Sequence, residues 1–393
     1  MAKGTTAGFF GKRKPPAVLK HEVLKQYTAT FTGMVGATNT EGRVVFLDGY
    51  AGAGRYDDGS PGSPLLTMST SLGMLPGRKL ECVFVERDRK PFLSLQEVTA
   101  EFRARGVPAV AVRGKVEDHL DAVITQAVGV PLFIFLDPCG VPLAFQRLVN
   151  VLTGPRAGRM PSTEVLLNFS DKAVRHIGGQ LAVGLKDQSG LASLNLACGG
   201  DWWQADYLKA AASDGAEAGV QAVVYGYAQR LHQEANASVI SVPVRVKPEH
   251  LPLYHLVFAT RSNYGLWVFG DSLAKAQKEW RAAQFEEEPD DPMDAGLLFG
   301  TEEILEARER DLQRAATAAI RKNLIALLER DKSFKLLDQV LPVFEGWYGT
   351  ARETWVRDAI KAMNADGLTD CNGVGRRIRE LVITRPSSGA SPT

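Results

Sequence analysis

The chain has 393 residues, of which 45% are hydrophobic and 23% are charged, and this ordinary balance excludes a wholly disordered protein. Its 46 basic and 45 acidic residues nearly cancel, so no global field draws it to nucleic acid or to an anionic membrane. No apolar run approaches the roughly 20 residues of a membrane helix, and the N-terminus has no apolar signal segment. The four cysteines lack metal-ligand spacing, so we expect a cytoplasmic, reduced protein with no metal centre.

Length and composition predict two or three parts. A basic stretch with Gly and Pro opens the chain, an acidic stretch with prolines follows residue 284, and a Ser- and Pro-containing tail ends it. The predicted parts are a flexible basic arm (1–17), a Rossmann-like domain (18–284), an acidic linker (285–300), a helical and winged-helix-like domain (301–384) and a disordered tail (385–393).

Short apolar runs alternate with segments of helical periodicity, after a first helix predicted from Val18 to Phe31. This alternation, with strands that are continuously apolar, predicts a doubly wound, mostly parallel α/β sheet. The predicted strands are 44–50, 81–86, 107–112, 131–137 and 164–170.

The alternation is interrupted at 171–235, where we expect a helical insertion that forms a cap or substrate wall. Later strands are predicted at 242–248, 254–262 and 265–273. The last two are expected to form a hairpin through Asn263, Tyr264 and Gly265.

The turn after the first strand, VVFLDGYAGAGRYDDG, is the first candidate site. Its glycines permit a tight turn and close backbone approach to an adenosyl cofactor, and an acidic residue at the strand end is usual for S-adenosylmethionine (SAM) sites rather than NAD sites. The alternative is a plain strand-to-helix turn. The predicted cofactor-binding residues of this turn are Asp48, Gly49, Ala51, Gly52, Gly54 and Tyr56, and the prolines of 60–64 predict a rigid loop over the cofactor.

The second strand ends in FVERD, where Glu86 is the natural acceptor for two ribose hydroxyls and Asp88 is the next candidate. The alternative is that Glu86 only caps the following helix. Glu117 follows the third strand, and there we prefer the ordinary role of an acid in the first turn of a helix.

The fourth strand ends in LDPCG, which places Asp137 at a carboxyl end, where ligands of open α/β sheets bind. This loop resembles the Asp-Pro-Pro-aromatic loop of amino-methyltransferases, in which the carboxylate and a backbone carbonyl accept hydrogen bonds from the target amine, but the aromatic residue is missing. The predicted catalytic residues are Asp137 and Pro138, with Gly140 beside the substrate. The alternatives are a structural Asp-Pro turn and, for Cys139, a nucleophile; we prefer a small buried thiol for Cys139.

The fifth strand leads into LLNFSDKAVRH, which brings polar residues to the same edge. The predicted substrate-binding residues here are Asn168, Ser170 and Arg175, the last suited to a phosphate or carboxylate. The alternative is a polar helix start with Ser170 as the N-cap.

The C-terminal region is predicted to contain helices followed by a basic segment. Thr350 and Glu353 form a predicted capping box, and Asn372-Gly373 suits a hairpin turn. Together these elements resemble a winged helix, with helical packing or dimerisation as the alternative. The predicted nucleic-acid contacts are Arg352, Arg357, Arg376 and Arg377.

The motifs together resemble the three-Cys-motif partner protein (TcmP) family, named for genes that accompany a radical-SAM-like protein with a three-cysteine motif. The resemblance runs from about Lys20 to Leu273 and depends on LDGYAGAGRYDDGSPGSPL, FVERD, LDPCG, the Asn168 to Arg175 segment and YHLVFATRSNYGL. It implies a class I SAM-dependent methyltransferase-like fold and a radical-SAM-like partner protein.

These motifs predict a SAM-dependent methyltransferase that acts on an amino group of nucleic acid, DNA or RNA. One alternative is a non-catalytic partner that keeps this fold to bind nucleic acid or protein. Another is a metal-dependent nuclease or hydrolase, which requires Asp48, Glu86 and Asp137 to converge on a metal ion. The sequence does not specify the oligomeric state.

Overall fold

The computed structural model describes residues 15–386, apart from 40, 57, 139, 159–160, 186 and 288–300. Most of the predicted arm, linker and tail, and the candidate nucleophile Cys139, therefore lie outside the described residues. The chain forms two compact units, Met1–Ser262 and Asn263–Thr393, so the division precedes the acidic stretch at which we expected it. Among the helices that the structure describes, none has both the length and the apolar character needed to cross a bilayer.

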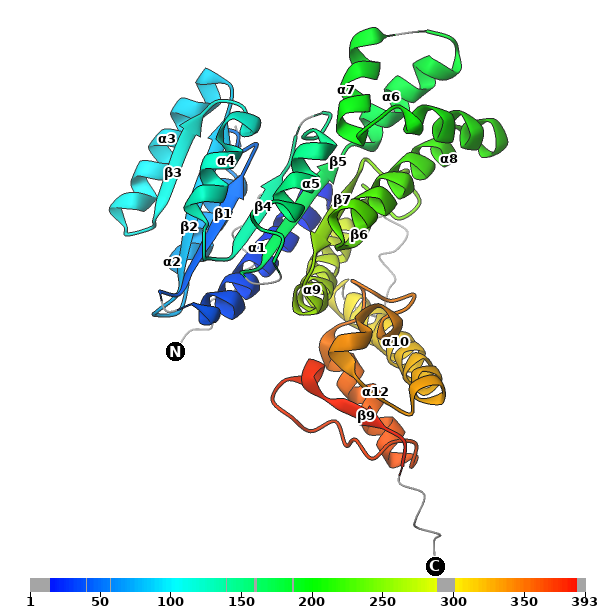
Figure 1. Ribbon diagram of the computed structural model, residues 1–393. Coiled ribbons are helices and arrows are strands. Elements are labelled where there is room, and N and C mark those ends of the chain that lie inside the picture. Colours follow the sequence, from blue (N-terminus) through cyan, green and yellow to red (C-terminus); the bar gives the residue numbers. More distant parts are fainter. Residues whose placement is uncertain are drawn as a thin grey trace, which may run out of the picture. The chain divides into compact units, whose positions relative to one another are not determined.

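Strands and helices alternate from β1 to β5 of the first unit, and the five strands predicted before residue 171 form within two residues of their predicted ends (Figure 1). The strands are β1 (Arg43–Asp48), β2 (Lys79–Glu86), β3 (Ala109–Arg113), β4 (Leu132–Leu136), β5 (Thr163–Phe169), β6 (Ser238–Val244) and β7 (Tyr254–Thr260). The helices are α1 (Pro15–Val35), α2 (Ser63–Leu72), α3 (Arg89–Ala104), α4 (Val116–Gln126), α5 (Phe145–Thr153), α6 (Asp171–Ala182), α7 (Gln188–Cys198) and α8 (Trp202–Ala235), with a 3-10 turn, η2 (Gly36–Thr38).

The seven strands form one sheet in the order β3-β2-β1-β4-β5-β7-β6. The neighbouring pairs among β1 to β5 are parallel, and β7 is antiparallel to both β5 and β6, which confirms the predicted Rossmann-like, mostly parallel sheet. The strand order reverses between β1 and β4, since the chain adds β2 and β3 on one side of β1 and then β4 on the other. In open α/β sheets, ligands bind beside such a reversal, at the carboxyl ends of the strands.

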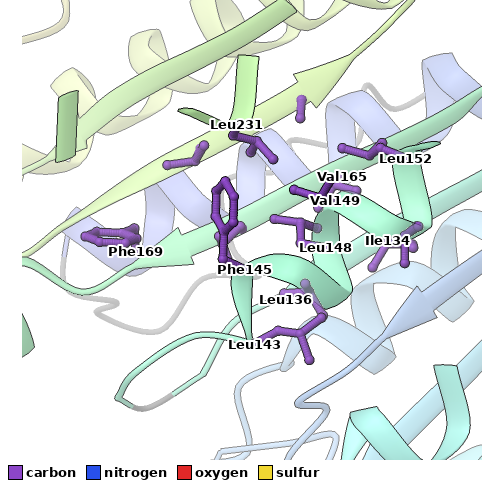
Figure 2. Packing of buried hydrophobic residues seen from close by; sticks show 14 of the residues in the cluster. Ile134, Leu136, Leu143, Phe145, Leu148, Val149, Leu152, Val165, Phe169 and Leu231 are labelled. Carbon is purple, nitrogen blue, oxygen red and sulfur yellow. The ribbon is translucent and has the colours of Figure 1, made fainter. Parts of the chain in front are cut away.

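Alternate residues of the central strands pack against opposite layers of helices. On one face, Tyr27 of α1 lies against Phe133 and Phe258, with ring centroids 5.3 and 5.2 Å away. On the other face, residues of β4, β5, α5 and α8 form one apolar cluster (Figure 2). The sheet is thus buried on both sides, as its continuously apolar strands predict.

A buried carboxyl group joins α1 to the sheet. Glu164 in β5 is 1% exposed and accepts hydrogen bonds from the Tyr27 hydroxyl and from Thr260 Oγ1, the latter at 2.9 Å. Burial raises the pKa of Glu164 to about 7, although the two hydrogen bonds favour its charged form. The folded protein therefore holds a proton at Glu164 that the unfolded chain releases at lower pH.

We expect Glu164 to make the protein less stable as the pH rises. Because its folded-state pKa of about 7 exceeds the ordinary 4.5, its contribution is complete below pH 4.5 and is lost as the pH rises through 7. The loss is on the order of 3 kcal/mol. Denaturant unfolding near the two ends of this range should show a smaller pH dependence for Glu164→Gln than for the wild type. An equal dependence in the two proteins would contradict the assignment.

The predicted helical insertion is present as α6, α7 and α8. α8 packs against α5, α6 and β6, so it covers part of one sheet face. It is bent at Asp214 and Gly215, where Gly215 has a φ of +84° that interrupts the helical backbone. Trp203 is fully buried near the start of α8, and its indole N–H donates to Asn195 Oδ1 at 2.8 Å.

The second unit begins with a helix, α9 (Asn263–Glu287), where we expected the strand 265–273 of a hairpin. That prediction was wrong because a short apolar run has the same pattern in a buried strand and in a buried helix. Here the run continues into good helix formers, and Leu266, Trp267 and Phe269 are buried on the helix. β7 pairs with β6 instead.

The rest of the second unit consists of α10 (Thr301–Asp331), β8 (Ser333–Lys335), η4 (Leu336–Gln339), α11 (Val340–Val343), α12 (Glu353–Ala365), η5 (Ile378–Glu380) and β9 (Val382–Thr384). β9 pairs antiparallel with β8, so the hairpin predicted at Asn372-Gly373 does not form in the described residues. That segment is a loop, and Arg357 holds it by donating to the carbonyl oxygens of Gly373 and Gly375.

The start of α12 is capped from α9 and not by the predicted capping box. Asp271 Oδ1 accepts the N–H of Glu353 at 3.0 Å and the Nε–H of Arg352 at 2.8 Å, whereas the Thr350 hydroxyl bonds to α9. Burial raises the pKa of Asp271, but the hydrogen bond from Arg352 and neighbouring positive charges hold it below its ordinary value. Sequence spacing could not find this cap, because its two partners lie 82 residues apart.

Asp271→Ala should destabilise the second unit by about 2 kcal/mol, since it removes a helix cap and leaves Arg352 without this carboxylate. Because the Asp271 pKa is depressed, the stabilisation is present at neutral pH and is lost as the pH falls through the folded-state pKa. Denaturant unfolding checks this against Asp311→Ala, an acid on α10 whose side chain is 67% exposed. A loss no larger than that of the control would show that the cap contributes little.

Candidate functional site

Asp48 ends β1 at the carboxyl edge of the sheet and is fully buried. Its Oδ1 accepts the N–H of Tyr50 at 3.1 Å, and its Oδ2 accepts the hydroxyl of Ser63 at 2.6 Å. Burial raises the pKa of Asp48 to about 7, while the two hydrogen bonds favour the charged form. Because Ser63 is the first residue of α2, Asp48 ties the glycine turn to the segment that follows it.

Gly52 and Gly49 have different roles in this turn. Gly52 has a φ of +64°, which favours glycine, and a Cβ added there would meet no atom within 4 Å. A ligand therefore has space to approach the backbone at Gly52. At Gly49 an added Cβ would lie 2.7 Å from Leu136 Cδ2 and 2.8 Å from Val116 Cγ2, so glycine is needed there for packing within the protein.

Glu86 at the end of β2 reaches the same turn. Its Oε2 accepts the N–H of Gly52 at 2.9 Å, and its Oε1 accepts the N–H of Asp88 at 2.6 Å. Glu86 thus lies beside the glycine turn, as a cofactor-binding role requires, and also bonds to the start of α3, as the capping alternative requires. Asp88 is exposed, and its side chain makes no capping bond.

The other predicted cofactor residues surround this turn. Ala51 is buried, and its N–H donates to the carbonyl of Val85 at 2.9 Å, which joins the turn to β2. Gly54 has a φ of +82°, again favourable for glycine. Tyr56 is 48% exposed, and its hydroxyl lies 3.4 Å from His21 Nε2 of α1.

Asp137 follows β4, the strand next to β1, and two side chains bond to it. Lys20 Nζ donates to Oδ2 at 2.5 Å, and Asn168 Nδ2 donates to Oδ1 at 2.7 Å. The side-chain amide oxygen of Asn168, Oδ1, is buried and has no hydrogen-bond partner among the described residues. Asp137 and Asn168 therefore offer two neighbouring acceptors suited to the hydrogens of an amine.

Lys20 is the site residue that the sequence analysis missed. It lies in α1 at helical spacing from the buried residues Leu24, Tyr27 and Phe31, so a lysine on an apolar stripe was the available signal. Burial lowers the pKa of Lys20, but the Asp137 carboxylate and the hydroxyl groups of Tyr254 and Tyr56 together raise it above the ordinary value. The Lys20 amine therefore remains protonated and does not act as a general base.

The start of α1 is held beside the site at two further points. The Tyr254 hydroxyl donates to the carbonyl of Pro16 at 3.0 Å, and burial raises the pKa of Tyr254 above its ordinary range. His21 and Tyr56 lie with their ring centroids 5.9 Å apart. These contacts hold the start of α1, which includes Lys20, against the glycine turn and β7.

The predicted substrate residues are divided between structural and open positions. Ser170 is the N-cap of α6 and accepts the N–H of Ala173 at 3.2 Å, which confirms the capping alternative. Arg175 is paired with Glu217 at 2.7 Å and is thus not an unpaired anion site. Pro138 is buried, whereas a Cβ added at Gly140 would meet no atom within 4 Å.

The arginines predicted to bind nucleic acid also differ in their surroundings. Arg352 is engaged by Asp271, and Arg357 by two loop carbonyls. Arg376 and Arg377 are exposed in the loop before η5. The two exposed arginines therefore remain the accessible candidates of the predicted set.

A metal centre would require convergent ligands. Within the part of the chain that the structure describes, no group of three or more His, Cys, Asp or Glu side chains is placed to hold a metal ion. Asp48, Glu86 and Asp137 instead bond to separate partners, namely Ser63, the turn backbone and Lys20. The cluster that the nuclease alternative requires is not formed by these three residues.

Comparisons with known proteins identify only distant likenesses. No family model and no curated protein matches the sequence. Among solved structures, the chain is similar to an O-methyltransferase from Bacillus cereus in complex with SAH, at 11% identity and a TM-score of 0.33 over 65% of this chain and 84% of that one. It is also similar to a putative O-methyltransferase from Klebsiella pneumoniae, at 12% identity and a TM-score of 0.31 over 65% and 92% of the two chains. Likenesses of this strength assign no activity to the chain.

Proposed function

We propose that the chain is a SAM-dependent methyltransferase whose cofactor is held by the turn after β1 and by Glu86. One observation carries this proposal: the open backbone of Gly52 beside Glu86 and the acceptor Asp137 flank the strand-order reversal between β1 and β4. Ligands of open α/β sheets bind at such a reversal.

The residues of the turn suit an adenosyl group. Glu86 keeps a further lone pair on each oxygen besides those that accept from Gly52 and Asp88, so it has acceptors for two ribose hydroxyls. The left-handed backbone at Gly52 leaves room for close approach. Asp48 maintains the shape of the turn through Tyr50 and Ser63.

The cofactor, when bound, supplies an activated methyl group, and the chain's own residues position the acceptor. We propose an amine that donates to Asp137 and to Asn168 Oδ1, which leaves the nitrogen lone pair directed at the methyl group. The nitrogen would bond to the methyl carbon as that carbon's bond to sulfur breaks, which would leave S-adenosylhomocysteine, and the nitrogen would lose one proton by way of Asp137 to solvent. Pro138 restricts the backbone that follows Asp137. Catalysis on this scheme is mainly a matter of orientation.

We further propose that this amine belongs to a nucleic acid. The second unit supports this with the exposed basic loop between α12 and η5. Arg376 and Arg377 are the proposed phosphate contacts, since they are exposed. We also propose that the chain binds a radical-SAM-like protein, as the resemblance to three-Cys-motif partner proteins implies.

Calorimetric titration of the full chain tests cofactor binding. We expect micromolar dissociation constants for SAM and S-adenosylhomocysteine and no binding of NADH, which shares the adenosine but has a pyrophosphate in place of the amino-acid portion. Absence of binding for both adenosyl ligands would overturn the proposal.

Transfer of a radiolabelled methyl group from SAM to total RNA, genomic DNA and bulk protein tests the acceptor. Label in RNA or DNA is the expected result. Label in protein alone would overturn the nucleic-acid part and leave the methyltransferase part standing.

A further inference from the structure

Lys20 is a largely buried cation beside Asp137, and the proposed function gives it no ligand of its own. Its side chain is 14% exposed, and that of its partner Asp137 is 19% exposed. The charge of Lys20 also acts on Asp48, and the hydroxyls of Tyr56 and Tyr254 lie near enough to act on Lys20. Keeping a charge away from water costs free energy unless the charge remains paired. A lysine at this position therefore indicates a functional role.

The charges around Lys20 complement the amino-acid portion of an adenosyl cofactor. That portion has an ammonium and a carboxylate, and SAM adds a positive sulfonium. Lys20 has the sign to attract this carboxylate, and Asp48, in its charged form, has the sign to attract the positive groups.

The position of Lys20 also suits this role. Its neighbour His21 contacts Tyr56 of the glycine turn, and Lys20 bonds to Asp137 across the strand reversal. A cofactor whose adenosyl group lies on Gly52 has to extend from that turn towards Asp137 in order to present a methyl group there. Lys20 lies at the Asp137 end of this route.

We propose that Lys20 binds the carboxylate of the cofactor's amino-acid portion and leaves Asp137 Oδ2 to do so. This inference rests on the proposed function and names the residue that recognises the cofactor's acid group. The exchange replaces one carboxylate partner by another, so the ammonium is never buried unpaired. The long, flexible lysine stem permits the movement. Asp137 Oδ2 then becomes available to the acceptor amine, so cofactor binding prepares the acceptor site.

Two ligands that differ in this portion test the proposal by calorimetry on the full chain. S-adenosylhomocysteine has the ammonium and the carboxylate, whereas 5′-methylthioadenosine has the same adenosine and sulfur without them. In Lys20→Gln we expect the affinity for S-adenosylhomocysteine to fall about tenfold to a hundredfold, with the affinity for 5′-methylthioadenosine unchanged within about twofold. Glutamine can still donate to Asp137, and Lys20→Met, which cannot, should give the same difference between ligands.

Lys25→Gln is the matched control, because Lys25 lies on the same helix with its side chain 46% exposed, 3.3 Å from Glu22. It should leave both affinities unchanged. Retained binding of 5′-methylthioadenosine also shows that a variant is folded. Equal losses for the two ligands in the Lys20 variants, or no loss for either, would overturn the role of Lys20. A wild-type protein that binds neither ligand would overturn the proposed function itself.

Discussion

Asp137→Asn should lower methyl transfer by about a hundredfold to ten-thousandfold without weakening the binding of S-adenosylhomocysteine. The substitution keeps the shape of the side chain but removes its charge and one of its two acceptor oxygens. Asn168 Nδ2 already donates to this carboxylate, so the single amide oxygen of the variant would have to accept from Asn168 and from the acceptor amine together. The substitution removes an interaction with the acceptor amine. We therefore expect the rate of methyl transfer to fall and the affinity for the cofactor to remain unchanged.

Single-turnover transfer of labelled methyl to total RNA and genomic DNA measures this rate. Asp121→Asn is the control, since Asp121 is an acid of α4 whose side chain is 77% exposed and pairs with Arg147 at 3.2 Å. A group that positions the acceptor should cost far more than about threefold in rate when it is removed. A rate for Asp137→Asn within about threefold of the wild type would therefore show that Asp137 does not bind the acceptor. A parallel loss of S-adenosylhomocysteine binding would assign Asp137 to the cofactor instead.

Gly52→Trp should weaken the binding of adenosyl ligands by about a hundredfold or more, because the indole would fill the space through which a ligand approaches the turn. That space is present in the structure, since a Cβ at Gly52 would meet no atom within 4 Å. The left-handed φ of +64° adds backbone strain of about 1–2 kcal/mol for any side chain. A control must therefore have the same strain.

Gly129→Trp provides that control. Gly129 has a φ of +75° and equally open surroundings, but it precedes β4 and so lies at the opposite end of the strands from the site. Both variants should lose similar stability, whereas S-adenosylhomocysteine should raise the melting temperature of Gly129→Trp and not that of Gly52→Trp. Equal ligand-induced stabilisation of the two variants would exclude the glycine turn as the cofactor site.

The sheet was predictable because its strands are short apolar runs bounded by glycine, proline or charged residues, and a strand buried on both faces needs no more than that. The run 265–273 has the same local pattern but forms part of α9. The apolar pattern alone does not show whether such a run forms a strand or part of a helix. A run becomes a strand of the sheet only where a neighbouring strand has free backbone hydrogen-bonding groups. β7 already has β5 and β6 as partners and offers no free edge.

The second unit departs from prediction for a related reason. The capping box at Thr350 and the hairpin at Asn372-Gly373 were inferred from residues close together in the chain. The structure satisfies the same backbone groups with distant partners: Asp271 caps α12, and Arg357 closes the loop. Short motifs identify positions that need a partner, but packing selects the partner.

The candidate site shows the same division. Asp48, Glu86 and Asp137 were predictable from sequence because each lies at or next to the end of an apolar run, and parallel strands bring such ends to one edge. Lys20 was not, because it is separated from Asp137 by 117 residues and comes from a helix that precedes the sheet. Only the packing of α1 against the sheet places this lysine beside Asp137, where partial burial reduces the competition of water for the pair.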